Sequence, residues 1–291
     1  MRKYEITFQS VNDIFYSKPI TVLVAEPDKI GPNTGAMLLS HGWGGNRYEL
    51  PGFSEFSCDQ FNLICLCAEY RQSGFDFDSV RGLGFDKPYD AGFYQVFDVL
   101  NALRTVLDLY PMINRGRLFH YGGSQGGYIA LLSSIFAPQT FAFVYAASAI
   151  TFLGPKYQNW AGREFAPYEL SIRNVIEHAD RIQCPLFLEH GTVDIDVPVD
   201  HTRLLAEKLS SLGKSFTVKY HEGGGHSLQP VTTRVDAFKA TAPDYLKTQV
   251  RAGKDDFAAG TVVSIPCADR TLRIDWSKPK DSMDLFAWEK A

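Results

Sequence analysis

A serine set among glycines is the first residue of this sequence whose surroundings point to chemistry. Ser124 lies within Gly122-Gly123-Ser124-Gln125-Gly126-Gly127, after the apolar run 118–121 and before an apolar run of helical period. A G-x-S-x-G turn between a strand and a helix holds the serine in a strained backbone and lifts its hydroxyl clear of the sheet. Ser124 is therefore a candidate nucleophile, although serine is also a common helix N-cap.

A serine nucleophile needs a base to accept its proton and a carboxylate to orient that base. In chain order the acid is expected after the serine and before the histidine. Asp194 fits, because it lies just past the predicted strand 186–189. Asp196 and Asp200 are the alternatives, and each also fits a solvated loop charge or a cap of the following helix. We assign the acid to Asp194.

The base is expected in the loop after the next predicted strand, 216–220. That strand leads into His221-Glu222-Gly223-Gly224-Gly225-His226. Three consecutive glycines give the loop the freedom to fold back over the sheet edge toward the acid and the serine. We therefore assign the general base to His226. The alternative, His221, is expected to be a surface residue at the end of the strand.

A glycine-rich loop supplies the remaining part of a hydrolytic site. The predicted strand 37–40 runs into His41-Gly42-Trp43-Gly44-Gly45. The oxyanion that forms on an attacked carbonyl is expected to be held by two backbone N–H groups, those of Gln125 at the helix start and of Trp43 in this loop.

Other histidines and the cysteines do not indicate a metal or a cofactor. His41 and His190 are expected to pack beside the glycine turns as hydrogen-bonded core residues, because no carboxylate cluster accompanies them. The cysteines have neither CxxC spacing nor a nearby histidine pair. They are expected to be buried free thiols in a reducing cytoplasm, and comprise Cys58, Cys65, Cys67, Cys184 and Cys267.

The elements that must position these residues alternate between strand and helix. From about residue 36 to 221, apolar runs of strand length alternate with segments of helical period, which predicts an α/β fold with a mostly parallel sheet. An antiparallel edge is predicted at 4–8 and 20–24, and an amphipathic helix over 90–110, ending before Pro111. The six central strands are predicted at 36–40, 63–68, 118–121, 141–147, 186–189 and 216–220.

Two long segments interrupt this alternation, residues 70–89 and 151–180. Both are long enough to be functional loops or a lid. Arg71 and Arg81 are expected to brace these loops rather than to bind an anion. The aromatic side chains of the two segments fit either a pocket wall or ordinary core packing, and comprise Phe75, Phe77, Phe85, Tyr89, Phe152, Tyr157, Trp160, Phe165 and Tyr168.

The predicted organisation is one hydrolase-like domain over 1–250, with a lid or insert at 151–180. Residues 251–291 form a C-terminal extension, in which a strand pair is expected at 261–265 and 271–276. The sequence offers no function for this extension.

Composition excludes several classes of protein. The 291 residues carry 29 Lys and Arg against 33 Asp and Glu, a formal net charge of −4, with no basic cluster. Nucleic-acid binding is therefore not expected, because it depends on clustered positive charge. The most apolar stretch, 141–150, is well short of the roughly 18 residues that span a bilayer, so no membrane span is expected. No export signal is visible at the N-terminus, and a cytoplasmic location is expected.

Four motifs in this order resemble those of α/β-hydrolases: HGWGG at 41–45, GGSQGG at 122–127, HGTVDIDVP at 190–198 and GGGHS at 223–227. Within that superfamily they resemble the catalytic domain of prolyl oligopeptidase-type serine peptidases. They also resemble the acetyl xylan esterase and cephalosporin-C deacetylase family, in which a bulky aromatic follows the HG pair. The likeness covers about residues 38–245.

The resemblance implies an α/β-hydrolase fold in which Ser124 is the nucleophile, His226 the base and Asp194 the orienting acid, with no cofactor and no metal. The first expectation is a carboxylesterase or deacetylase that acts on small acyl esters. A peptidase acting on short peptides is the alternative. A non-catalytic binding protein of the same fold is the alternative from another class. The expected partner is thus a small ester or a short peptide, and the sequence leaves homo-oligomerisation open.

Overall fold

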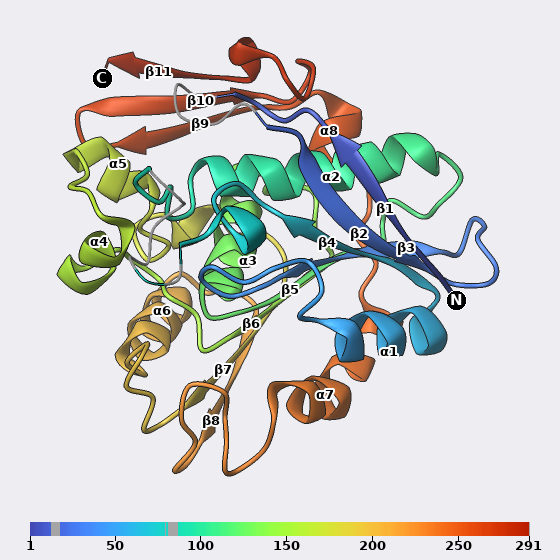
Figure 1. Cartoon of the computed structure of the whole chain (residues 1–291), viewed down its shortest axis with the longest axis horizontal. Helices are drawn as coiled ribbons and strands as arrows, with labels where there is room; N and C mark the ends of the chain where they lie inside the picture. The colour runs from blue at the N-terminus through green and yellow to red at the C-terminus, as the bar shows by residue number, and fades with distance from the viewer. Residues whose placement is uncertain (13–17, 79, 81–86, 291) are drawn as a thin grey trace.

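The structure, a computed structural model, describes residues 1–12, 18–78, 80 and 87–290 (Figure 1). Its strands are β1 (Arg2–Phe8), β2 (Ile20–Glu26), β3 (Gly35–Ser40), β4 (Leu63–Glu69), β5 (Leu118–Gly123), β6 (Phe143–Ala147), β7 (Leu186–Gly191), β8 (Phe216–His221), β9 (Val262–Cys267), β10 (Arg270–Asp275) and β11 (Phe286–Lys290). Its α-helices are α1 (Pro51–Phe61), α2 (Tyr94–Leu109), α3 (Gln125–Phe136), α4 (Pro155–Ala161), α5 (Pro167–Ile172), α6 (Asp200–Ser211), α7 (Arg234–Thr248) and α8 (Asp256–Ala259).

The first eight strands form one sheet in the order β1-β2-β4-β3-β5-β6-β7-β8. From β4 to β8 all neighbouring strands are parallel, whereas β1 and β2 form an antiparallel edge. This arrangement confirms the predicted mostly parallel sheet and its antiparallel edge. Because the carboxyl ends of parallel strands lie at one edge of the sheet, the loops after β3, β5, β7 and β8 are brought together there.

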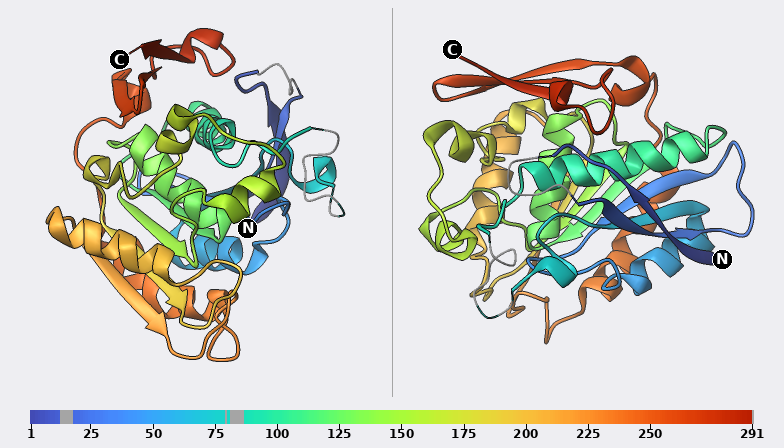
Figure 2. Two further views of the ribbon diagram at one scale, coloured as in Figure 1. Left: turned by 90° about the vertical axis from the view of Figure 1, so that its left-hand side faces the viewer. Right: turned by 45° about the horizontal axis from the view of Figure 1, so that its top comes forward.

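Helices cover both faces of this sheet (Figures 1 and 2). On one face, α1 and α7 pack over a buried aromatic cluster that includes Phe53, Tyr121 and Phe238. On the other face, α2, α3 and α6 bury a larger apolar cluster. Such cover on both faces explains why the central strands are nearly continuous apolar runs.

Helix α2 begins at Tyr94, four residues after the start that the sequence predicts. The delay has a backbone cause, because Ala91 and Gly92 adopt φ angles of 53° and 106°, outside the right-handed helical region. The Asp90 carboxylate then accepts a hydrogen bond from the amide of Gln95, in the first turn of the helix. The segment that the sequence predicts as helical therefore begins before the point at which the backbone becomes helical.

The C-terminal segment forms a second, three-stranded sheet in the order β11-β10-β9. This sheet lies on the α2 and α5 side of the molecule, away from α1 and α7 (Figure 2). Trp276 anchors it: the indole is buried and donates a hydrogen bond to the carbonyl of Phe136, at the end of α3. Strand β11 was not predicted from the sequence. In it, the half-buried side chains of Phe286 and Trp288 alternate with exposed neighbours.

The apolar stretch and the thiols both lie inside the fold. Residues 143–147 of the stretch form β6, a central strand. In the part of the chain that the structure covers, no helix combines the length and the apolar character needed to cross a membrane. The five cysteines are free and buried, as predicted.

Candidate active site

The turn between β5 and α3 holds Ser124 in an unusual backbone conformation, with φ 58° and ψ −125°. Its glycines are required by close approach. A Cβ on Gly122 would lie 2.1 Å from the carbonyl carbon of Gly126, and one on Gly126 would lie 2.0 Å from the Ser40 carbonyl oxygen. The strained turn expected of the G-x-S-x-G motif is therefore present.

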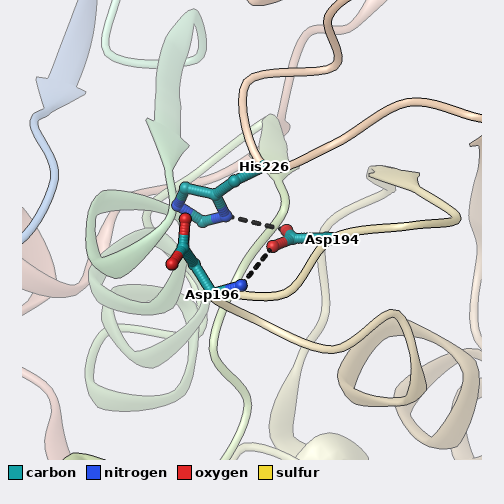
Figure 3. Close-up of side chains that lie close together, drawn as sticks. All are labelled: Asp194, Asp196 and His226. Atoms are coloured by element: carbon teal, nitrogen blue, oxygen red, sulfur yellow. Dashed lines mark hydrogen bonds and ion pairs between the residues drawn. The ribbon is translucent and has the colours of Figure 1, made fainter.

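Ser124, His226 and Asp194 form one continuous chain of hydrogen bonds. Ser124 Oγ lies 2.9 Å from His226 Nε2. On the other side of the ring, His226 Nδ1 lies 2.7 Å from Asp194 Oδ2, the bond drawn in Figure 3. Asp194 comes from the loop after β7 and His226 from the loop after β8. Chemically, this arrangement can pass the serine proton to the imidazole while a carboxylate fixes the imidazole tautomer.

Asp194 is held as a carboxylate by several donors. Its Oδ1 accepts the amides of Asp196 and Val197, both at 2.9 Å, and its Oδ2 also lies 3.1 Å from His190 Nε2. Burial alone raises the pKa of Asp194. The hydrogen bonds from His190, His226 and the Val197 amide outweigh burial, and they bring the pKa well below its ordinary value.

His190 and His41 are buried and hydrogen-bonded, as predicted. His190 Nε2 lies 3.1 Å from Asp194 Oδ2 and 2.8 Å from the Val197 carbonyl oxygen, both acceptors, so Nε2 carries a proton, and Nδ1 lies 2.7 Å from Thr202 Oγ1. This contact with the acid was missed at the sequence level, although the two residues share one short segment. His41 stacks on Tyr70 with ring centroids 4.0 Å apart, and burial lowers its pKa to about 4. It is therefore a neutral core residue at physiological pH.

None of the alternatives for acid and base takes part in this chain of hydrogen bonds. His221 was expected at the surface, and this prediction is wrong: it is 5% exposed and its Nε2 lies 3.0 Å from the Glu189 carboxylate. Its side chain turns inward because β8 pairs with β7, so that a buried carboxylate becomes its partner. Asp200 is the first residue of α6 and pairs with Arg203 on the surface. Asp196 is exposed at the cavity described below.

The two amides expected to bind an oxyanion belong to segments that meet at the serine, the loop after β3 and the start of α3. A Cβ on Gly42 would lie 4.0 Å from the Ser124 Cβ, which places the loop after β3 against the serine. Tyr89 joins this loop to α3, because it stacks on Trp43 at 4.4 Å and its hydroxyl donates to the Gln125 side chain at 3.0 Å. Among the described residues, neither the Trp43 nor the Gln125 amide donates a hydrogen bond. Both amides are thus available to a ligand.

Ser124 and His226 open onto a cavity of about 460 Å³. Its wall combines aromatic rings with charged groups. The lining residues are Ser40, His41, Gly42, Trp43, Glu49, Leu50, Phe53, Tyr121, Gly123, Ser124, Trp160, Asp196, Val197, His226 and Arg234.

The sequence left the aromatics of the two long segments open between a pocket wall and core packing, and the structure divides them. Phe85 lies outside the described residues. Of the eight that are described, Trp160 lines the cavity and the other seven do not. Tyr89, for example, lies fully buried behind Trp43. Phe53 of α1 and Tyr121 of β5 line the wall instead, and nothing in the sequence distinguishes these two buried aromatics from core residues.

Arg71 braces its loop, as predicted. Its guanidinium is buried and donates to both carboxylate oxygens of Asp98, at 2.7 and 2.8 Å, and to the carbonyl of Val11. The bidentate pair ties the segment after β4 to helix α2. Arg81 lies outside the described residues.

Asp194, Asp196 and His226 also lie close enough together to be considered as metal ligands. One donor atom from each lies within 4.8 Å of the other two. However, His226 Nδ1 and Asp194 Oδ2 already bond to each other (Figure 3). Two of the three residues are therefore already joined to each other, and the set fits a proton relay better than a metal site.

Comparison with known families gives a match over more than half of the chain. Residues 86–252, more than half of the chain, match the profile of the prolyl oligopeptidase family. This range contains the serine, the acid and the histidine, but not the loop after β3.

Curated relatives are similar over about half of the chain. The chain is 26% identical over 149 residues to an uncharacterized peptidase, YtmA, of Bacillus subtilis (strain 168), covering 47% of this chain and 58% of that protein. It is 24% identical over 163 residues to dipeptidyl peptidase 8 of Homo sapiens, covering 51% of this chain and 18% of that protein. The chain therefore spans less than two thirds of these relatives.

Solved structures share the fold at low identity. An acylaminoacyl peptidase of Pyrococcus horikoshii superposes with a TM-score of 0.70 at 16% identity, covering 87% of this chain and 42% of that chain. A puromycin-hydrolyzing peptidase of Mycobacterium tuberculosis gives 0.65 at 18% identity, covering 84% and 39%. The predicted α/β-hydrolase fold is thereby confirmed. The predicted preference for small esters finds no support among these proteins.

Proposed function

The chain belongs to the prolyl oligopeptidase family of serine hydrolases, and on that premise we propose that it is a serine peptidase that cleaves short peptides through an acyl-enzyme. One observation carries the proposal: a strained serine, a histidine and a buried aspartate are hydrogen-bonded in series at the mouth of a cavity. We propose peptides rather than esters as the substrates because the family and the relatives named above are peptidases.

In this proposal, Ser124 Oγ attacks the peptide carbonyl carbon while its proton passes to His226 Nε2. The amides of Trp43 and Gln125 stabilise the oxyanion. His226 then gives the proton to the leaving amine as the C–N bond breaks, which leaves an acyl group on Ser124. Water attacks this ester while its proton passes to His226. As the bond between the acyl carbon and Ser124 Oγ breaks, His226 returns the proton to Oγ, which releases the acid and restores the serine hydroxyl.

Asp194 acts in this proposal through His226. By accepting a hydrogen bond from Nδ1–H it keeps Nε2 free to receive the serine proton, and its negative charge stabilises the imidazolium that forms. The low pKa of Asp194 is consistent with this role, because the carboxylate stays ionised when His226 becomes protonated.

We propose the same organisation that the sequence suggests: a hydrolase domain over 1–250, an insert at 151–180 and a C-terminal extension at 251–291. The insert contains α4 and α5 between β6 and β7 and contributes Trp160 to the cavity. The extension carries the second sheet, remote in sequence from the triad.

A fluorophosphonate probe tests the nucleophile. The wild-type protein should be labelled, and Ser124→Ala should not. An unlabelled but folded wild type would contradict the proposal and favour a binding protein of the same fold.

Matched substrates test the reaction type. We expect aminoacyl-proline anilides to be hydrolysed with release of the anilide, and p-nitrophenyl acetate to serve only as a reference ester. Activated esters also react with serine peptidases, so ester cleavage alone decides nothing. Rapid cleavage of unactivated acetyl esters, with no detectable cleavage of any anilide, would instead establish an esterase.

A further inference from the structure

Charged groups line the active-site cavity unevenly. Asp196 and Glu49 each contribute a carboxylate, and Arg234 contributes a guanidinium. Arg234 is already engaged, since its Nη2 donates to the main-chain carbonyl of His226 at 2.5 Å. A ligand entering the cavity therefore meets two negative groups and one positive group that is partly satisfied.

Asp196 is held rigidly beside the triad. Its amide donates to Asp194 Oδ1 at 2.9 Å, and its carbonyl accepts Lys156 Nζ at 2.8 Å and the Tyr157 hydroxyl at 3.3 Å. The main chain of Asp196 is therefore hydrogen-bonded at both its amide and its carbonyl. Its carboxylate lies next to the His226 imidazole (Figure 3). Such pre-organisation lowers the cost of binding a ligand there.

The Asp196 carboxylate has no partner of its own. Within the ranges that the structure covers, no group donates a hydrogen bond to it, and no Lys or Arg lies within 4.0 Å of it. Glu49 differs, because its carboxylate accepts the amide of Asn46 at 3.1 Å. Burial raises the pKa of Glu49. Asp196 is thus the cavity carboxylate that is better prepared to pair with a cation.

The surrounding wall also suits a polar, partly cationic ligand. Tyr121 lines the cavity and is 1% exposed, and its hydroxyl bonds to no described group. A buried hydroxyl without a partner costs free energy that a ligand or water recovers. Trp43 and Trp160 meet edge to face at 5.7 Å in the same wall, and the Trp160 ring already holds a cation, Lys156 Nζ, at 4.9 Å from its centroid.

We propose that Asp196 binds the free α-ammonium group of the substrate, so that the enzyme prefers short peptides with an unblocked N-terminus over N-acylated ones. This inference rests on the proposed peptidase function and deepens it. The α-nitrogen of an aminoacyl group lies about 2.5 Å from its carbonyl carbon. That carbon must approach Ser124 Oγ to about 3 Å. An ammonium one or two residues from the cut is therefore within reach of a carboxylate beside His226.

The test compares four p-nitroanilides: those of alanine, acetylalanine, alanylproline and acetylalanylproline. The wild type should cleave at least one free amine faster than its acetylated counterpart. Asp196→Asn should lower kcat/KM for that free-amino substrate by roughly 10- to 100-fold, since it removes a charge-assisted hydrogen bond. It should lower kcat/KM for the acetylated counterpart much less. The preference should return in Asp196→Glu, which restores the charge.

A matched control removes the same charge away from the cavity. Asp200→Asn changes an exposed carboxylate on α6 that does not line the cavity, so it should leave the preference unchanged. Equal or faster cleavage of both acetylated substrates by the wild type would overturn the inference. So would a preference that survives Asp196→Asn.

A second measurement needs no turnover. The dipeptide alanylproline should slow fluorophosphonate labelling of Ser124 in the wild type more than acetylalanylproline does, and Asp196→Asn should abolish this difference. Equal protection by both dipeptides would overturn the inference while labelling itself leaves the proposed nucleophile intact. Absence of labelling would instead contradict the proposed function. Labelling also shows that Asp196→Asn is folded.

Discussion

Two carboxylate–histidine pairs bridge the same two neighbouring strands of this protein. Asp194 pairs with His226, and Glu189 pairs with His221; in both pairs the partners are 32 positions apart. Glu189 and His221 lie within β7 and β8, whereas Asp194 and His226 lie in the loops that follow those strands. Nearly the same ingredients therefore occur twice, five residues apart along each segment.

The pairs differ in which imidazole nitrogen meets the carboxylate. His226 uses Nδ1, so that Nε2 is left to face Ser124 at 2.9 Å. His221 uses Nε2 for Glu189. The His226 side chain is 24% exposed, against 4% for His221. A histidine acts as a general base only if its second nitrogen reaches a nucleophile at a place that substrate can enter.

The two carboxylates also differ in their surroundings. Both oxygens of Asp194 are hydrogen-bonded, to two histidines and two amides. In Glu189, Oε2 meets His221, but Oε1 has no partner among the described residues. The fully bonded acid is suited to hold a charge through each reaction cycle. The other pair is suited to join β7 to β8, from which the acid and base loops begin.

The largest expected effect separates the two histidines. His226→Ala should lower kcat/KM for a peptide anilide by roughly 10⁴- to 10⁶-fold, because the serine loses its proton acceptor. His221→Ala should remain within about 10-fold of the wild type, because His221 contacts neither serine nor cavity. If the two variants exchanged these phenotypes, the general base would be misassigned.

The next effect concerns the acid. Asp194→Asn should lower kcat by roughly 10³- to 10⁴-fold. The neutral amide no longer fixes the His226 tautomer in which Nδ1 carries the proton and Nε2 is free to accept one. Glu189→Gln is the matched control, since it makes the same chemical change in the other pair, and it should retain most of the activity. Equal losses in kcat would indicate that both pairs take part in catalysis.

The three side chains that are hydrogen-bonded in series could be picked out from sequence because each lies next to a strong local signal. Ser124 sits in a glycine turn, Asp194 follows a strand, and His226 follows three glycines. The inward turn of His221 could not be predicted, because it depends on a buried carboxylate across a strand pairing. From the sequence, Asp196 is only an alternative acid. Its approach to His226 could not be predicted, because it depends on the tertiary fold of the loop.

The same distinction holds for the fold. Most of the central strands are continuous apolar runs, so their positions along the chain could be predicted from the pattern of apolar residues. The start of α2 was not, because Ala91 and Gly92 leave the helical region although the apolar periodicity continues. The cavity wall was also missed where it comes from α1 and β5, since Phe53 and Tyr121 are indistinguishable in sequence from core residues.

A smaller effect should appear in stability. His221→Ala leaves Glu189 buried without its partner, so the free energy of unfolding should fall by about 3 kcal/mol, or roughly 6–12 °C in Tm. The double variant Glu189→Leu/His221→Leu should recover most of this loss, because it removes both polar groups together. Thermal melts that show no loss in the single variant would mean that the pair does not stabilise the β7–β8 edge.

The smallest effect concerns how kcat/KM changes with pH. The protonated form of His226 cannot accept the serine proton, so kcat/KM should fall as the pH falls. Hydrogen bonds keep the pKa of Asp194 well below its ordinary value, so this carboxylate stays ionised over the same range and adds no second proton. A plot of log kcat/KM against pH should therefore rise on the acid side with a slope of about 1, one proton per active site, in both the wild type and His221→Ala. A slope near 2 that returned to 1 only in His221→Ala would show that the buried pair titrates with activity, and the functional contrast between the two pairs would not hold.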